Sequence, residues 1–160
     1  RGERVVFGAP GSPPAHVGEA LRASWGIPGW MPPVAIGGRR YVDGGARSTA
    51  SVDLIAPHEA DIVYVIAPMA SAPGVRIPGV GGFLENQLLR RPMSRILDDE
   101  VTEARLGGTR VVTILPGQRD LDGLCANFMN RSHRRAAFDA AMISAPATVA
   151  RALETAGATT

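Results

Sequence analysis

Lysine is absent from this chain of 160 residues, so that all 17 of its basic residues are arginines. The 15 acidic residues leave a formal net charge of only +2. Proteins that bind nucleic acid through its phosphates carry a strong or clustered positive charge. A balance this close to neutral argues against a nucleic-acid partner.

Cysteine is nearly absent as well, and long apolar runs are missing. The single Cys125 has no partner for an intrachain disulfide, so nothing in the chain demands an oxidising compartment. No apolar run approaches the roughly 20 residues that a membrane-spanning helix needs. We therefore expect a cytoplasmic protein, or one that is peripheral to a membrane.

Metal-ligand spacings are also missing. His16, His58 and His133 have no cysteine or carboxylate placed as a metal site would need. We interpret the three histidines as surface residues and Cys125 as a buried structural thiol. No metal ion and no cofactor is predicted.

What the chain does contain is a pattern of alternating strands and helices. With 45% hydrophobic residues, 19 glycines and 13 prolines, it can bury a core that is interrupted by frequent turns. Residues 61–67 and 109–115 are apolar and rich in β-branched side chains, which predicts central strands buried on both faces. Residues 4–8 predict a further short strand. This alternation is typical of a layered α/β domain.

The helical segments are marked by their spacing and their end signals. We predict helices over residues 12–24, with Ser12 as the N-cap, over 84–106, 121–129 and 134–153. Pro92 is expected to kink or divide the second of these helices, and Gly107 to stop it.

A β-hairpin is predicted between the first and the second of these helices. Residues 34–37 and 39–42 are two short strands around Gly37-Gly38, which is a favoured two-residue connection. Asp43 then lies at the end of the second strand. Gly44 and Gly45 lack the Cβ atoms that would block a sharp turn or the close approach of a second backbone segment. On its own, Asp-Gly predicts no more than a common turn.

The surroundings of this tripeptide change that interpretation. The run from Ala23 to Gly45, which ends in Tyr41-Val42-Asp43-Gly44-Gly45, resembles the C-terminal half of the patatin-like phospholipases. In these serine hydrolases the Asp of an Asp-Gly-Gly or Asp-Gly-Ala signature partners a Ser nucleophile. The resemblance implies a three-layer α/β/α hydrolase fold, a lipid or ester substrate, and a role in lipid degradation. It makes Asp43 the candidate catalytic residue and Gly44 and Gly45 its motif support. Looser similarity extends over residues 4–145.

The nucleophile of this family is missing from the chain. It sits in a Gly-x-Ser-x-Gly elbow upstream of the Asp, and no such motif occurs among these 160 residues. We therefore expect residues 1–160 to be the C-terminal part of a single patatin-like hydrolase domain, inactive alone and completed by an upstream half. The alternative is a non-catalytic binding or assembly module derived from the same fold.

The chemistry of such a dyad places a demand on Asp43. A Ser hydroxyl is a weak nucleophile that needs a base within hydrogen-bond reach, and an ordinary Asp, with a pKa of about 3.9, is a poor base. An apolar environment would raise its basicity. The resemblance implies that Asp43 takes the Ser proton directly, without a histidine.

Two features suggest contact with a membrane surface. The Arg-Arg pairs at 39–40, 90–91 and 134–135 could meet anionic headgroups, although such pairs also occur on solvated faces. The loop predicted over residues 71–83 carries spaced apolar residues, and it could be a lid, a lipid contact or an ordinary surface connection.

Overall fold

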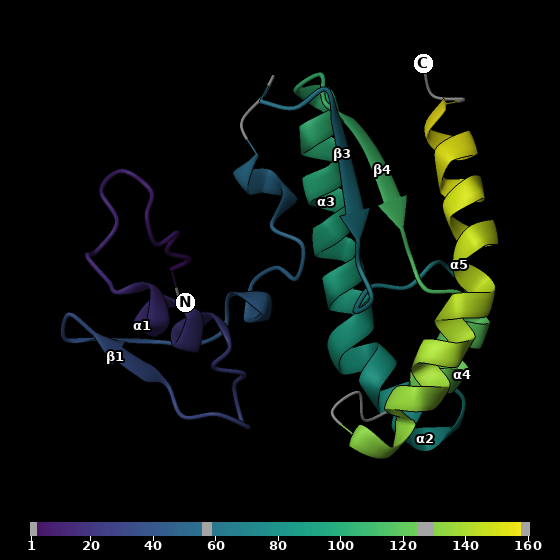
Figure 1. Ribbon diagram of the computed structural model, residues 1–160, viewed down its shortest axis with the longest axis horizontal. Coiled ribbons are helices and arrows are strands. Elements are labelled where there is room, and N and C mark those ends of the chain that lie inside the picture. Colours follow the sequence, from purple (N-terminus) through teal and green to yellow (C-terminus); the bar gives the residue numbers. More distant parts are fainter. Residues whose placement is uncertain (1–2, 56–58, 125–129, 158–160) are drawn as a thin grey trace. The chain divides into compact units, whose positions relative to one another are not determined.

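The computed structural model describes residues 3–55, 59–124 and 130–157, and it divides the chain into two compact units (Figure 1). Unit 1 comprises Arg1–Thr49 and unit 2 comprises Ala50–Thr160. Each unit is described by itself. None of the helices in the described ranges has both the length and the apolar character needed to cross a membrane.

Among its described residues, unit 1 contains one α-helix, α1, over Val17–Ser24. Its N-cap is His16, whose amide donates a hydrogen bond to the Glu19 carboxylate at 3.0 Å. The prediction that Ser12 caps this helix is wrong. The Ser12 hydroxyl instead accepts a hydrogen bond from the Gly8 amide at 3.1 Å, so Ser12 belongs to the preceding turn.

The strand predicted over residues 4–8 is also wrong. The Ala9 amide bonds to the Val6 carbonyl at 3.2 Å, and Gly8 has a positive φ of 93°, so that the chain turns there. A strand needs a neighbour for its amides and carbonyls. Within the described residues neither sheet includes this segment, and turn bonds form at Ala9 and Ser12.

The hairpin prediction is confirmed. Strands β1 (Val34–Ile36) and β2 (Arg39–Tyr41) pair antiparallel, with Ile36 opposite Arg39. Gly37 and Gly38 have φ values of +56° and +77°, as a type I′ turn requires. The Phe7 ring meets the Tyr41 ring edge-on at a centroid distance of 5.1 Å, which ties the N-terminal segment to the hairpin.

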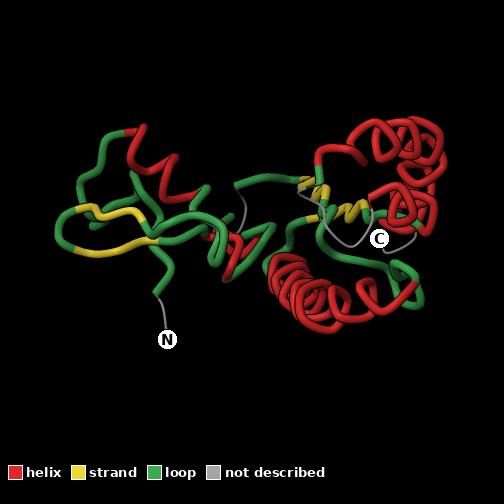
Figure 2. Tube along the Cα trace, turned by 90° about the horizontal axis from the view of Figure 1, so that it is seen from below, coloured by secondary structure: helices red, strands yellow, loops and turns green. Residues whose placement is uncertain are grey.

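Unit 2 is built around a parallel pair of strands. Strands β3 (Ile62–Ile66) and β4 (Arg110–Ile114) align from Ile62 opposite Arg110 to Ile66 opposite Ile114. Helix α3 (Arg91–Leu106) lies on one face of this pair and α5 (Arg134–Gly157) on the other (Figure 2). The predicted α/β class is thereby supported, while the complete three-layer hydrolase domain stays a prediction.

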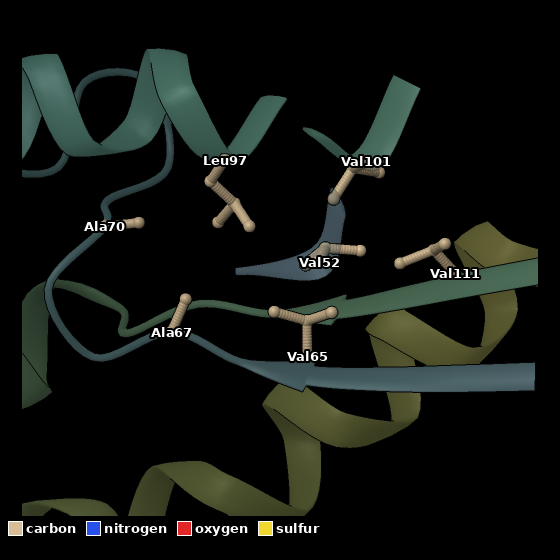
Figure 3. Packing of buried hydrophobic residues seen from close by; sticks show 7 residues of the cluster. All are labelled: Val52, Val65, Ala67, Ala70, Leu97, Val101 and Val111. Carbon is tan, nitrogen blue, oxygen red and sulfur yellow. The ribbon is translucent and has the colours of Figure 1, made fainter. Parts of the chain in front are cut away.

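The core of unit 2 lies between α3 and the two strands. Leu97 and Val101 of α3 pack onto Val65 of β3 and Val111 of β4 (Figure 3). Val52 joins them from the 3₁₀ helix over Val52–Leu54, and the cluster also includes Ala67 and Ala70. Each fully buried Val or Leu contributes roughly 1.5–3 kcal/mol. This cluster therefore supplies much of the stability of unit 2.

The two strands differ in how they are covered. Val111 and Val112 of β4 are both buried, so both faces of β4 are covered, as predicted. On β3, Ile62, Tyr64 and Ile66 are exposed, so burial on both faces is wrong for this strand. The reason is that α5 packs mainly on β4 and leaves one face of β3 open.

The helical segment before β4 begins earlier than predicted. Helix α2 (Gly79–Glu85) continues through a π-helical turn (Asn86–Arg90) into α3. Pro92 lies in the first turn of α3, directly after the π-helical turn, and this local change in hydrogen-bond pattern accommodates its missing amide. The predicted stop at Gly107 is confirmed, and near Pro92 the helix changes from π-helical to α-helical geometry.

Two helices complete unit 2. Helix α4 spans Gln118–Leu124, and the rest of the helix predicted up to residue 129, Cys125 included, lies outside the described residues. Helix α5 contains Pro146 in its interior. Gly123 allows α4 to approach α5 closely, because a Cβ there would lie 3.0 Å from the Ala136 carbonyl oxygen.

Candidate active site

Asp43 lies in a capped turn directly after the hairpin. Its amide donates to the Gly26 carbonyl at 3.0 Å, and its carbonyl accepts from the Ala46 amide at 3.1 Å. Its carboxylate oxygen Oδ1 accepts from the Gly45 amide at 2.7 Å and so caps the 3₁₀ helix Gly44–Ala46. Two hydrogen bonds therefore hold the Asp43 backbone, and one orients its side chain.

The two motif glycines differ in their surroundings. A Cβ on Gly45 would lie 3.1 Å from Asp43 Oδ1, which is tighter than an ordinary contact, whereas a Cβ on Gly44 would meet open space. The structure thus gives a steric reason for glycine at position 45 only. That either glycine supports catalysis stays a prediction.

Gly26 is a positioning residue that the sequence did not single out. It is buried, and a Cβ there would lie 3.2 Å from the Ala23 carbonyl oxygen and 3.7 Å from Val42 Cα. Because Gly26 has no Cβ, the end of α1 can lie close to Val42, the residue before Asp43. The available signal was a glycine directly after the helix, which is an ordinary helix stop in the sequence.

Asp43 is half-buried. The Gly45 amide is its one hydrogen-bond donor within the described ranges, so Oδ2 accepts no bond there. An ionised carboxylate accepts hydrogen bonds and can take a proton from a hydroxyl about 2.6–3.2 Å away. The geometry therefore leaves one oxygen of the pair in a position to act as a base.

The serines of the chain do not complete a dyad in the described part of the structure. Ser12 is engaged with Gly8, and Ser71 donates its amide to the Ser94 hydroxyl at 3.0 Å. No serine hydroxyl among the described residues bonds to Asp43. The structure thus brings together Asp43 and its turn, and it brings no nucleophile to them.

An unusual polar group lies two residues before Asp43. The Tyr41 hydroxyl is buried and has no hydrogen-bond partner within the described residues. A buried hydroxyl without a partner costs about 1–3 kcal/mol. Within the described residues, unit 1 therefore supplies no polar group that bonds to the Tyr41 hydroxyl.

Helix α1 presents its apolar side outward. Val17, Leu21 and Trp25 follow one another at four-residue spacing, as predicted for one face, and all three are exposed. The buried residue of α1 is Ala23. An apolar helical stripe normally faces a core or a partner.

The histidines and the arginine pairs differ in how far they are exposed. His16 is exposed at the N-cap of α1, His133 is half-buried, and His58 lies outside the described residues. Where the chain is described, no three histidine, cysteine or carboxylate side chains are grouped so as to hold a metal ion. Of the three predicted arginine pairs, the one at 90–91 is not a surface pair, because Arg90 is fully buried.

Comparison with protein families gives one match. Residues 1–56 match the family of patatin-like phospholipases, which is about a third of the chain and includes the whole run from residue 23 to residue 45. The resemblance read from that run is thereby confirmed. Comparisons with curated proteins and with solved structures gave no match.

Proposed function

We propose that this chain carries the catalytic Asp of a patatin-like serine acyl hydrolase, a phospholipase or lipid esterase, and that Asp43 is that residue. The observation that carries the proposal is that the family match covers a capped turn in which Asp43 presents a half-buried carboxylate with one uncommitted oxygen. The Ser nucleophile of the proposed dyad comes from an upstream segment outside these 160 residues.

The proposed chemistry uses the two oxygens of Asp43 separately. The Gly45 amide holds Oδ1, while Oδ2 accepts the proton of the Ser hydroxyl as the Ser oxygen attacks the ester carbonyl. The proton then passes to the departing alcohol, leaving an acyl group on Ser. Water repeats the sequence in the second step and releases the carboxylic acid.

Three features of the chain support an upstream partner segment. Unit 1 exposes the apolar stripe of α1 and leaves the Tyr41 hydroxyl without a polar neighbour in the described residues. In unit 2, β3 pairs with β4 along one edge, no other strand in the described part of the chain pairs with it, and its Ile62, Tyr64 and Ile66 side chains are exposed. A further segment of the same domain would cover such surfaces.

One observation favours the alternative of a non-catalytic binding or assembly module. The Asp43 turn is held by residues of this chain, because Gly26 and Ala46 bond its backbone and the Gly45 amide caps it. A turn of this kind serves a hairpin equally well in a protein that catalyses nothing.

Substitution of Asp43 in the complete protein, with this chain and its upstream segment together, tests the proposal. Asp43→Asn keeps the shape but removes the base, so ester hydrolysis should fall by about two to four orders of magnitude. Asp99→Asn, at an exposed position on α3, is the matched control and should leave turnover unchanged. If Asp43→Asn kept near-normal turnover, Asp43 would not be the catalytic base, and the non-catalytic module would be the remaining proposal for this chain.

The 160-residue chain alone gives a second test. It should hydrolyse no ester and should not be labelled by a fluorophosphonate, because the activated Ser is supplied from elsewhere. A labelled serine together with ester turnover would contradict the proposed origin of the nucleophile.

A further inference from the structure

Helix α2 and the π-helical turn expose a row of apolar side chains. Val80, Phe83, Leu84 and Leu88, here called the α2 face, are 80%, 55%, 51% and 71% exposed. Their spacing of three and four residues places them on one side of the helical segment. The buried residues of the same segment, Gly82, Glu85 and Arg90, lie on its other side.

The inner side of this segment is held by polar and backbone contacts. The buried Arg90 side chain donates through Nε to Glu85 at 2.7 Å, and through Nη1 to the carbonyls of Pro68 and Ala70 at 2.8 and 3.3 Å. A Cβ on Gly82 would lie 2.0 Å from the Ile77 carbonyl oxygen, so the helix backbone sits directly on that residue. Anchored in this way, the segment does not need its outer apolar side chains for its own packing.

Within residues 74–97, the exposed charges near the α2 face are of one sign, and the exposed Asp98 and Asp99 follow one turn after Arg95. Between residues 74 and 97 the only acidic residue is Glu85, and the buried Arg90 pairs with it. The exposed charges of this stretch are Arg76, Arg91 and Arg95. An exposed apolar row flanked by exposed arginines is the pattern of a helix that lies in a membrane interface.

We propose that the α2 face docks on the surface of an anionic lipid bilayer. The apolar row enters the boundary between headgroups and acyl chains, and Arg91 and Arg95 meet the lipid phosphates. The sequence suggested a loop over 71–83 and the pair 90–91 for such a contact. The structure relocates the contact to a helix that begins at Gly79, with Arg91 and Arg95 as its surface cations. The choice of lipid as the partner rests on the proposed function.

Vesicle co-sedimentation of the 160-residue chain tests this inference. The chain should bind vesicles of phosphatidylcholine with phosphatidylglycerol more tightly than vesicles of phosphatidylcholine alone, and salt should weaken the binding. Val80→Ser with Leu88→Ser should reduce the affinity about tenfold or more. Arg91→Glu with Arg95→Glu should do the same and remove most of the salt dependence.

Matched controls separate the α2 face from charge and hydrophobicity in general. Arg110→Glu with Arg151→Glu makes the same change in net charge at the start of β4 and in α5, and Leu106→Ser removes another exposed leucine at the end of α3. These variants should bind as the unchanged chain does. Equal loss in the controls, or no preference for anionic vesicles, would overturn the proposal. So would α2-face variants that abolish self-association of the chain but leave vesicle binding unchanged, since the face would then join two copies.

Binding is measured without hydrolysis, so the two proposals fail separately. Asp43→Asn should bind vesicles like the unchanged chain, because Asp43 is not part of the α2 face. If the complete protein hydrolyses no ester while the chain still binds vesicles through the α2 face, only the proposed function is overturned. An active complete enzyme whose α2 variants bind normally would overturn the docking surface only.

Discussion

The two units use their helices in opposite ways. In unit 2, α3 buries Leu97 and Val101 against both strands, while in unit 1, α1 turns Val17, Leu21 and Trp25 outward. The family match falls almost entirely on unit 1, the unit with little core of its own. The candidate site is therefore held by hydrogen bonds rather than by a packed interior, since Asp43 bonds to Gly26, Gly45 and Ala46.

The difference between the units can be measured because the chain offers two separate probes. Both tryptophans, Trp25 and Trp30, belong to unit 1, so their fluorescence reports on it. The long helices α3 and α5 belong to unit 2, so they dominate the far-ultraviolet circular dichroism. Denaturant unfolding followed by both signals assigns each loss of stability to its unit.

The largest expected effect comes from one substitution made in each unit. Leu97→Ala removes a fully buried side chain and should lower the free energy of unfolding of unit 2 by about 2–5 kcal/mol. Leu21→Ala removes an exposed side chain of α1 and should change the stability of unit 1 by no more than about 0.5 kcal/mol. Comparable losses in the two variants would show that α1 packs as α3 does.

Local signals in the sequence predicted part of this structure correctly. Gly37-Gly38 fixed a two-residue turn with positive φ, and the apolar β-branched runs gave β3 and β4. Gly107 ended α3 where it was expected. Each of these features depends on the residues at the position itself, so the sequence is sufficient to find it.

The features that were missed depend on distant residues. Burial on both faces of β3 requires a helix above it, and no pattern within residues 61–67 shows that α5 lies over β4 instead. Arg90 looks like one half of a surface pair until the carbonyls of Pro68 and Ala70 are seen around it. At the candidate site, the Asp was found from its motif, but the bond to Gly26 crosses a loop and was not.

A second contrast follows from helical glycines in the two units. Gly82→Ala in α2 would force a Cβ to within 2.0 Å of the Ile77 carbonyl oxygen, a distance that real Cβ atoms do not reach. The backbone must shift, so unit 2 should lose about 1–3 kcal/mol or more, seen as an earlier dichroism transition. If the variant unfolds at the same denaturant concentration as the unchanged chain, the close seating of α2 on Ile77 is wrong.

The buried pair in unit 2 predicts a pH effect on the stability of that unit. Burial raises the pKa of Glu85, and this outweighs the opposing attraction of Arg90. A raised pKa in the folded state means that its contribution to stability is fully present below the ordinary value of 4.5 and is lost as the pH rises through the folded value. The stability of unit 2 should therefore decline over that window.

Glu85→Gln removes the titrating group and should flatten the decline. The measurement is the dichroism midpoint in denaturant at a series of pH values, compared with Glu103→Gln, which changes an exposed carboxylate on α3. The control should keep the slope of the unchanged chain. Parallel pH curves for Glu85→Gln and the unchanged chain would assign the decline to other groups.

The smallest expected effect is a gain in unit 1. Gly18 lies in the first turn of α1, and a Cβ there would meet nothing within 4 Å. Alanine costs less backbone entropy than glycine in a helix, so Gly18→Ala should stabilise unit 1 by about 0.5–1 kcal/mol, measured by tryptophan fluorescence. The same substitution would then have opposite signs at Gly18 and Gly82, because only Gly82 is pressed against a neighbour. A loss of stability in Gly18→Ala would mean that this side of α1 is covered, and that the contrast between the two units is smaller than their exposed surfaces indicate.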